Sequence, residues 1–247
     1  MRIIGGDTER KTAPWLPQTR WFWEESVHAI PPPCGEVHIW TALFQRPHDE
    51  VSLRRCLSKK ELLHEASFGT DELRHRFTVS HGRLRCVLAR YLSCAPEDVK
   101  LVTMPYGKPC LLKGRLFFNM AHTDKRVMIV VSTDGPVGVD AEEIQQIPES
   151  RAIARRWFST KENRWIESRH DERKAFLRCW VRREAFLKAL GVGLNASGIS
   201  FEFIPPPSPL VFQAGERTIH VQDMQPNRQY VCALASCRKS RRNENDV

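Results

Sequence analysis

The alternation of hydrophobic and polar positions predicts a chain of short strands and a few amphipathic helices. Residues 37–43 alternate in the way that a half-buried strand does. Residues 77–92 carry apolar side chains at helical spacing and arginines on the other faces, which predicts the main helix of the first half. Residues 173–190 predict the corresponding helix of the second half, ended by Gly191 and Gly193.

Shorter elements fill the rest of the chain. Helices are expected at residues 151–158 and 161–167, and Ser58 followed three residues later by Glu61 indicates a capped helix start. The expected strands, separated by turns, span residues 99–104, 116–119, 127–132, 137–142, 199–203, 210–213, 218–222 and 230–235. Each half therefore runs strand, helices, strands, which predicts an α+β fold of two similar lobes.

This pattern divides the chain into four segments. Residues 1–36, rich in tryptophan and proline, are expected to form an irregular lead-in, and residues 237–247 a basic flexible tail. The N-terminal lobe is expected to span residues 37–134 and the C-terminal lobe residues 135–236. No residue-level repeat relates the two lobes.

Composition and charge narrow the class of protein. The 247 residues are 41% apolar and 27% charged, as in an ordinary globular protein. No apolar stretch is long enough to span a bilayer and no signal-peptide pattern is present, so we expect a cytoplasmic protein with no membrane partner. The net charge of +9 favours a polyanionic partner: nucleic acid, a phosphorylated small molecule or an acidic protein surface.

The eight cysteines show no metal-binding or disulfide pattern. No pair forms C-x-x-C, and no cluster of cysteine and histidine has the spacing of zinc ligands. Cys86 and Cys179 lie within apolar helical patterns, where a reduced core thiol is expected. All eight are therefore predicted to be reduced.

Two acidic residues of the second half are candidate metal ligands. Asp140 and Glu142 are two residues apart on a predicted strand, so both carboxylates point to one face. They repel each other unless a cation lies between them, and Mg²⁺ suits such a pair because it takes few protein oxygens. The alternative is an ordinary solvated strand face, and Glu143 points to the other side.

The long helix of the second half supplies a further carboxylate and a cation. Glu184 and Lys188 are one turn apart on one helical face. In isolation they predict a surface ion pair. Beside the buried stripe of the helix, however, Glu184 could complete a three-carboxylate metal site and Lys188 could meet a phosphate.

The first half contributes two polar signals. Gly107-Lys108-Pro109 reads as a tight turn that presents a cation and backbone donors. Residues 118–123 read as a strand that ends in His122, which in isolation would be structural or simply exposed.

Five motifs in this order closely resemble those of the 4′-phosphopantetheinyl transferases of the larger, surfactin-synthetase-activating type. They are Gly107-Lys108-Pro109, FNMAHT at 118–123, GVDAE at 138–142, Phe158 with Glu162, and WVRREAFLK at 180–188. The resemblance spans about residues 37–235. It implies two pseudo-symmetric α+β lobes with the active site in the cleft between them.

The resemblance implies a defined reaction. Such enzymes transfer phosphopantetheine from coenzyme A to a serine of an apo-acyl or apo-peptidyl carrier protein and release adenosine 3′,5′-bisphosphate. They depend on Mg²⁺, with Mn²⁺ as a substitute. A monomer with no nucleic-acid partner is implied, whereas the carrier and its pathway stay open.

The resemblance also assigns residues. Asp140, Glu142 and Glu184 would hold the metal, and the catalytic residues would be Glu184, Lys188 and Asp140, with Glu184 as base for the carrier serine directly or through a metal-bound water. The coenzyme A contacts would be Arg76, His81, Gly107, Lys108, Pro109, Asn119, Ala121, His122, Asp140 and Lys188.

The chain departs from the family pattern at several places. His81 stands where many relatives have an arginine for the 3′-phosphate of coenzyme A, so either His81 or a neighbouring arginine meets that phosphate. Arg183 replaces a lysine and keeps its charge, and Ala121 replaces a serine. None of these changes removes a predicted metal ligand.

A second function class is a catalytically inactive basic module that binds nucleic acid or an acidic protein. The chain lacks nucleic-acid-binding motifs and basic strands with interleaved aromatic residues. The intact Asp140, Glu142, Glu184 and Lys188 favour the transferase.

Overall fold

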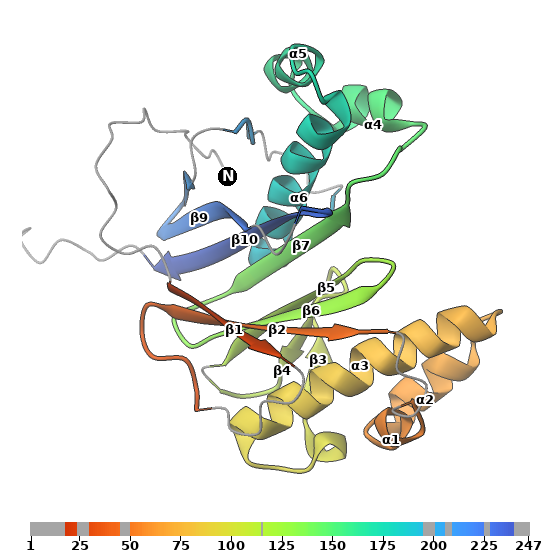
Figure 1. Cartoon of the computed structure of the whole chain (residues 1–247). Helices are drawn as coiled ribbons and strands as arrows, with labels where there is room; N and C mark the ends of the chain where they lie inside the picture. The colour runs from red at the N-terminus through yellow and green to blue at the C-terminus, as the bar shows by residue number, and fades with distance from the viewer. Residues whose placement is uncertain are drawn as a thin grey trace, which may run out of the picture. The chain divides into compact units, whose positions relative to one another are not determined.

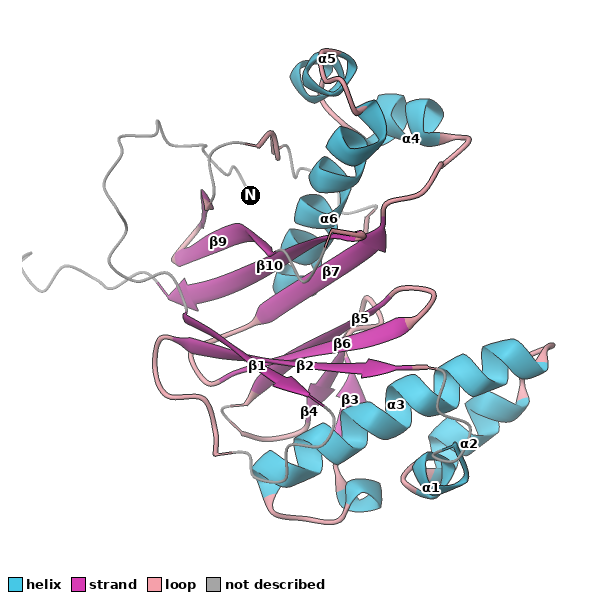
Figure 2. Cartoon of the chain, viewed as in Figure 1, coloured by secondary structure: helices cyan, strands magenta, loops and turns pink. Residues whose placement is uncertain are grey.

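The structure is a computed structural model that describes residues 18–23, 30–44, 50–114, 116–194, 201–205, 209–224 and 228–239. The chain divides into two compact units, and their described parts begin at Gln18 and at Asp134 (Figure 1). Each unit combines helices with a four-stranded sheet, which confirms the predicted α+β class (Figure 2). The observed division lies one residue before the predicted one.

The sheet of the first unit has the strand order β1-β2-β6-β5. Only β1 and β2 are parallel, and the other neighbours are antiparallel. The four strands are β1 (Gln18–Trp23), β2 (Glu36–Leu43), β6 (Arg126–Ser132) and β5 (Phe117–His122).

Helix α3 (Asp71–Leu92) forms the core of this unit with the sheet. It starts at Thr70, whose side chain accepts a hydrogen bond from the backbone N–H of Leu73, and it buries Leu84 and Leu88 completely. These side chains share one apolar cluster with Trp40. The sequence predicted this helix only from residue 77, because its first turns are mostly polar and show no helical spacing of apolar residues.

Short elements complete the first unit. Helix α2 begins with the predicted capping box, in which Ser58 and Glu61 exchange side-chain and backbone hydrogen bonds. The remaining elements are α1 (Glu50–Arg55), α2 (Lys59–Ala66), η2 (Pro96–Asp98) and the hairpin of β3 (Leu101–Thr103) with β4 (Pro109–Leu111).

The sheet of the second unit is antiparallel throughout, with the order β7-β10-β9-β8. Its strands are β7 (Val137–Glu143), β8 (Leu210–Ala214), β9 (Arg217–Met224) and β10 (Tyr230–Lys239). The helices are α4 (Ser150–Trp157), α5 (Thr160–Glu167) and α6 (Glu172–Leu190), all within one residue of the predicted bounds. Among the described residues, no helix is long and apolar enough to cross a membrane.

Two segments differ from the predicted organisation. Residues Gln18–Trp23 of the expected irregular lead-in form β1, because they pair with the edge of β2 in the register Gln18↔Glu36. At the other end, residues 237–239 of the predicted flexible tail belong to β10, which continues to Lys239: Cys237 is buried and its N–H donates to the carbonyl of Pro136. Residues 1–17, 24–29 and 240–247 lie outside the described residues.

The expected strand at 199–203 is also wrong for the residues that the structure describes. Phe201 and Phe203 are buried in the core but belong to no strand. The reason is that the N–H of Phe203 donates to the carboxylate of Glu162, 2.9 Å away, instead of to a neighbouring strand.

Gly82 sets the distance between α1 and α3. A methyl group at this position would lie 2.8 Å from both the Cβ and the carbonyl oxygen of Leu53. Since the backbone of Leu53 cannot yield as a flexible side chain would, α1 packs against α3 only because residue 82 has no side chain.

We predict that Gly82→Ala lowers the free energy of unfolding by about 2 kcal/mol, because the overpacking exceeds the gain in helix propensity. Gly69→Ala is the matched control, since nothing lies within 4 Å of the added methyl group. Thermal unfolding of both variants checks this, and equal stabilities would contradict the close packing.

Candidate functional site

Strand β7 and helix α6 approach each other unusually closely at Gly138. A Cβ atom here would lie 2.0 Å from the carbonyl oxygen of Ala185 and 2.4 Å from the backbone nitrogen of Ala189. Side chains alternate along a strand, so Asp140 and Glu142 share the α6 side of the sheet with Gly138. The glycine of the GVDAE motif therefore brings Asp140 up to the helix.

Asp140 and Lys188 form the centre of the candidate site. The ammonium of Lys188 donates to Oδ1 of Asp140 over 2.7 Å. Asp140 is 6% exposed, whereas Lys188 is half-buried. The sequence predicted both residues but not this direct contact, since it depends on how close α6 comes to β7.

Glu184 lies one turn before Lys188 and completes the group. Burial and, next, the negative charge of Asp140 raise the pKa of Glu184 above its ordinary value, opposed by Lys188 and Arg183. Its Oε1 is buried and accepts no hydrogen bond from the described residues. The structure thus brings together Asp140, Glu184 and Lys188, as the motifs predicted.

The fit of these residues to a divalent cation can be judged from the donor atoms. In the described part of the chain, no three His, Cys, Asp or Glu side chains gather closely enough to form a metal-binding group. The chemistry of the side chains nevertheless fits a hard cation, because Asp140, Glu142 and Glu184 offer carboxylate oxygens as ligands. The Oε1 of Glu184 accepts no hydrogen bond from the described residues. The assignment of these three carboxylates as metal ligands stays a prediction.

The motif formed by Phe158 and Glu162 is structural in this protein. Glu162 is fully buried, accepts hydrogen bonds from the backbone N–H groups of Ser159 and Phe203, and pairs with Arg183 over 3.2 Å. The Arg183 guanidinium lies 5.3 Å from the ring centres of both Phe158 and Phe203. Arg183, which stands where the family has a lysine, therefore ties α6 to α5 and to the segment around residue 203.

Sequence reasoning missed a second anchor of α6. Arg182 is fully buried and donates to Asp223 of β9 over 2.5 Å, and Arg178 donates to the same carboxylate over 2.6 Å. Burial opposes the ionisation of Asp223, but the two arginines hold its pKa below its usual range. The four-residue spacing of Arg178 and Arg182 places both on one face of the helix, which could have indicated a shared partner, but nothing in the sequence pointed to Asp223.

The candidate coenzyme A contacts of the first unit lie on the β3–β4 hairpin, on β5 and, for Arg76 and His81, on α3. Gly107 adopts a left-handed conformation with φ of 85° and donates to the carbonyl of Met104, which closes the turn before Lys108 and Pro109. On β5, Asn119 and Ala121 are buried and His122 at the strand end is exposed.

Arg76 is committed to the turn between β5 and β6. Its guanidinium donates to the backbone carbonyls of Thr123 and Asp124 over 3.0 and 3.3 Å, and it lies 5.0 Å from the ring centre of Phe44. Since Thr123 directly follows His122, this contact fixes α3 to the end of β5 that carries the candidate histidine.

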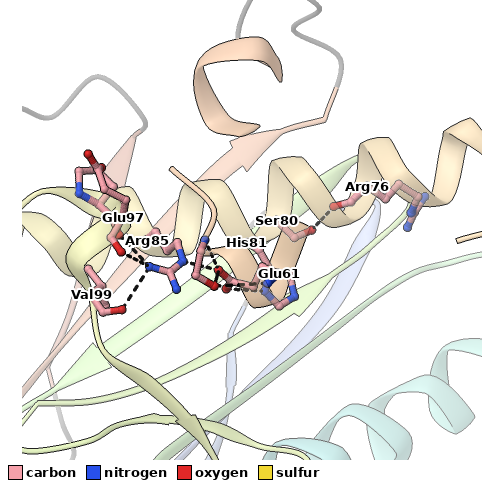
Figure 3. Close-up of polar contacts among 9 residues, drawn as sticks. Glu61, Arg76, Ser80, His81, Arg85, Glu97 and Val99 are labelled. Carbon is pink, nitrogen blue, oxygen red and sulfur yellow. Dashed lines mark hydrogen bonds and ion pairs between the residues drawn. The ribbon is translucent and has the colours of Figure 1, made fainter. Parts of the chain in front are cut away.

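His81 belongs to a network of polar contacts around Glu61 (Figure 3). Its Nδ1 lies 3.5 Å from Glu61, and its ring stacks on Phe77 with centres 4.0 Å apart. Burial opposes the ionisation of Glu61, but hydrogen bonds from His81 and Ser58, together with the charge of Arg85, lower the pKa of Glu61 to about 2.

Arg85 lies on the same helix as His81 and was an alternative candidate for the phosphate contact. In the structure it stabilises the fold instead. It is 3% exposed and donates to Glu61 and to the carbonyls of Pro96, Glu97 and Val99 (Figure 3). The metal-site candidates and the other coenzyme A candidates belong to different units, and the predicted cleft between lobes stays a prediction.

We predict that Gly138→Ala lowers the free energy of unfolding by about 3 kcal/mol, because the added methyl group would overlap backbone atoms of α6. Gly193→Ala is the control, with nothing within 4 Å of the new atom, and its stability should stay within about 0.5 kcal/mol. Urea unfolding measures both changes. A Gly138→Ala variant as stable as the parent would disprove the close approach of β7 and α6.

Comparison with known proteins agrees with the motifs. The family model of the 4′-phosphopantetheinyl transferase superfamily matches residues 136–235, which contain β7, α6 and the candidate metal ligands. The 4′-phosphopantetheinyl transferase HetI of Nostoc sp. is 33% identical over 64% of this chain and 70% of its own length. The 4′-phosphopantetheinyl transferase psf-1 of Bacillus pumilus is 34% identical over 65% of this chain and 72% of its own length. The 4′-phosphopantetheinyl transferase Sfp of Bacillus subtilis is 28% identical over 60% of this chain and 64% of its own length. The chain therefore belongs to the 4′-phosphopantetheinyl transferase superfamily.

Proposed function

We propose that the protein transfers 4′-phosphopantetheine from coenzyme A to the serine of an apo-carrier protein and releases adenosine 3′,5′-bisphosphate. The observation that carries the proposal is the group of Asp140, Glu184 and Lys188, assembled at the contact of β7 and α6. These residues stand at the metal, base and phosphate positions of the family motifs.

Each residue of this group has a distinct task in the proposed reaction. Glu184 accepts the proton of the serine hydroxyl, and the serine oxygen attacks the phosphorus of the phosphopantetheine group. The bond from that phosphorus to the bridging oxygen of the pyrophosphate breaks, and adenosine 3′,5′-bisphosphate leaves. Lys188, placed beside Asp140, directs its positive charge at the negative charge of the phosphates.

Asp140, Glu142 and Glu184 would hold the Mg²⁺ ion, with Mn²⁺ as an alternative. The ion supplies neutralisation of the pyrophosphate charge, which phosphoryl transfer requires. The net charge of +9 supports an anionic substrate and an acidic carrier protein. An acyl carrier or a peptidyl carrier would fit this description equally.

The transfer can be tested by the intact mass of an apo-carrier protein after incubation with coenzyme A and Mg²⁺. We expect a gain of about 340 Da, the mass of phosphopantetheine less water, on the serine nucleophile. Asp140→Asn should slow the transfer roughly 100-fold or more, because it removes a charge needed on the pyrophosphate side of the site.

Glu143→Gln is the matched control, since Glu143 is the next carboxylate of β7 but faces the other side of the sheet. It should transfer at the parental rate. No mass gain with either an acyl or a peptidyl carrier would overturn the proposed function. A parental rate for Asp140→Asn would overturn the role of Asp140 alone.

A second prediction concerns the 3′-phosphate of coenzyme A. We propose His81 as the contact because its side chain is partly exposed, whereas Arg85 is almost completely buried among backbone carbonyls and Arg76 binds the β5–β6 turn. His81→Ala should raise the KM for coenzyme A about tenfold, the loss expected for one charge-assisted hydrogen bond. The KM for 3′-dephospho-coenzyme A should not change.

His75→Ala serves as the control on the same helix, since His75 pairs with Glu50 and is partly exposed in the same way. Steady-state kinetics with both substrates separates the cases. An equal rise of KM for coenzyme A and its dephospho form would show that His81 acts on the fold and not on the phosphate.

A further inference from the structure

Two thiols of the first unit lie close together although 30 residues separate them in sequence. The Sγ atoms of Cys56, just after α1, and Cys86, within α3, are 3.6 Å apart. Both side chains are partly exposed, and both cysteines are reduced. A disulfide needs about 2 Å between the sulfurs, so a small movement would join them.

The close packing at Gly82 explains this placement. Leu53 of α1 lies directly over Gly82, and Cys56 and Cys86 each follow this contact by about one helical turn. The two thiols are therefore brought together by the backbones of α1 and α3 and not by flexible side chains.

Cys86 also borders a small cavity between α3 and the sheet. The cavity has a volume of about 20 Å³, which is room for about one water-sized molecule. Its lining includes the side chains of Arg83 and Arg90, and Arg90 lies 5.1 Å from the ring centre of Trp40. The cavity therefore leaves room for a small molecule beside Cys86.

We propose that Cys86 and Cys56 form a peroxide-reactive dithiol site, with Cys86 as the attacked thiol and Cys56 as the resolving thiol. The observations that carry the proposal are the second thiol at 3.6 Å and the cavity for one small molecule beside Cys86. The site is independent of the transferase reaction.

The proposed reaction takes place in two steps. The sulfur of Cys86 attacks hydrogen peroxide: an S–O bond forms, the O–O bond breaks, and the departing hydroxide takes the proton of the Cys86 thiol to become water. Cys56 then attacks the sulfenic sulfur: the S–S bond forms, the S–O bond breaks, and the hydroxide that leaves takes the Cys56 proton. Two thiols are oxidised and one peroxide is reduced to two waters.

The assignment of roles follows from the surroundings of the two thiols. Burial, followed by the nearby Cys86, raises the pKa of the Cys56 thiol to about 12, so Cys56 is protonated at neutral pH. Cys86 is the thiol that borders the cavity. Peroxide therefore meets Cys86 first.

Tryptic mapping of the full chain after treatment with hydrogen peroxide tests the proposal. Cleavage after Arg55, Lys59, Arg85 and Arg90 releases the peptides CLSK and CVLAR, each with one cysteine. We expect a linked CLSK–CVLAR species that is about 2 Da lighter than the sum of the peptides and that dithiothreitol reverses. In Cys56→Ser, dimedone should instead label Cys86 as a sulfenic acid.

Cys94→Ser is the matched control, since Cys94 is an exposed cysteine at the end of α3 and should not affect the link. Unlinked CLSK and CVLAR after complete consumption of peroxide would overturn the proposal. Links between CVLAR and the Cys94 peptide in place of CLSK would do the same. Dimedone labelling of Cys56 in Cys86→Ser, with none of Cys86 in Cys56→Ser, would overturn the assigned roles.

Discussion

The candidate site depends on one steric constraint, the contact of α6 with β7 at Gly138. Any side chain at this position would overlap backbone atoms of Ala185 and Ala189. The contact places Lys188 on Asp140 and leaves Glu184 close enough for its pKa to respond to the Asp140 charge. The chemistry proposed for this protein thus rests on a missing side chain as much as on the charged ones.

Two arginines of α6, the fully buried Arg182 and the half-buried Arg183, hold the helix in place at that contact. Arg182 binds Asp223 of β9 and Arg183 binds Glu162, which belongs to α5, so two ion pairs anchor α6 next to the candidate residue Glu184. Breaking a buried ion pair by removing one partner leaves an uncompensated charge, which is strongly destabilising. Within the WVRREAFLK motif, Arg182 and Arg183 therefore hold the helix, whereas the next residue, Glu184, is the one proposed to take part in the reaction.

The sequence predicted the elements whose pattern is local. The long helices and the strand with Asp140 were visible from periodicity, and the family motifs pointed to the same residues that the structure brings together. It failed where the cause was non-local: β1 needs the edge of β2, and Phe203 leaves its expected strand because its N–H is taken by Glu162. The pairing of Arg182 with Asp223 is likewise a tertiary contact that no spacing in the chain reveals.

The positions of several arginines change the interpretation of the net positive charge. At sequence level, a net charge of +9 suggested a surface for a polyanion. In the structure, Arg85 and Arg182 are almost completely buried, and Arg76 binds backbone carbonyls. A guanidinium is suited to this because it offers several donors in a fixed plane. These arginines therefore hold loops and helices in place, and Lys188 of the candidate site is positioned by an acidic partner, Asp140.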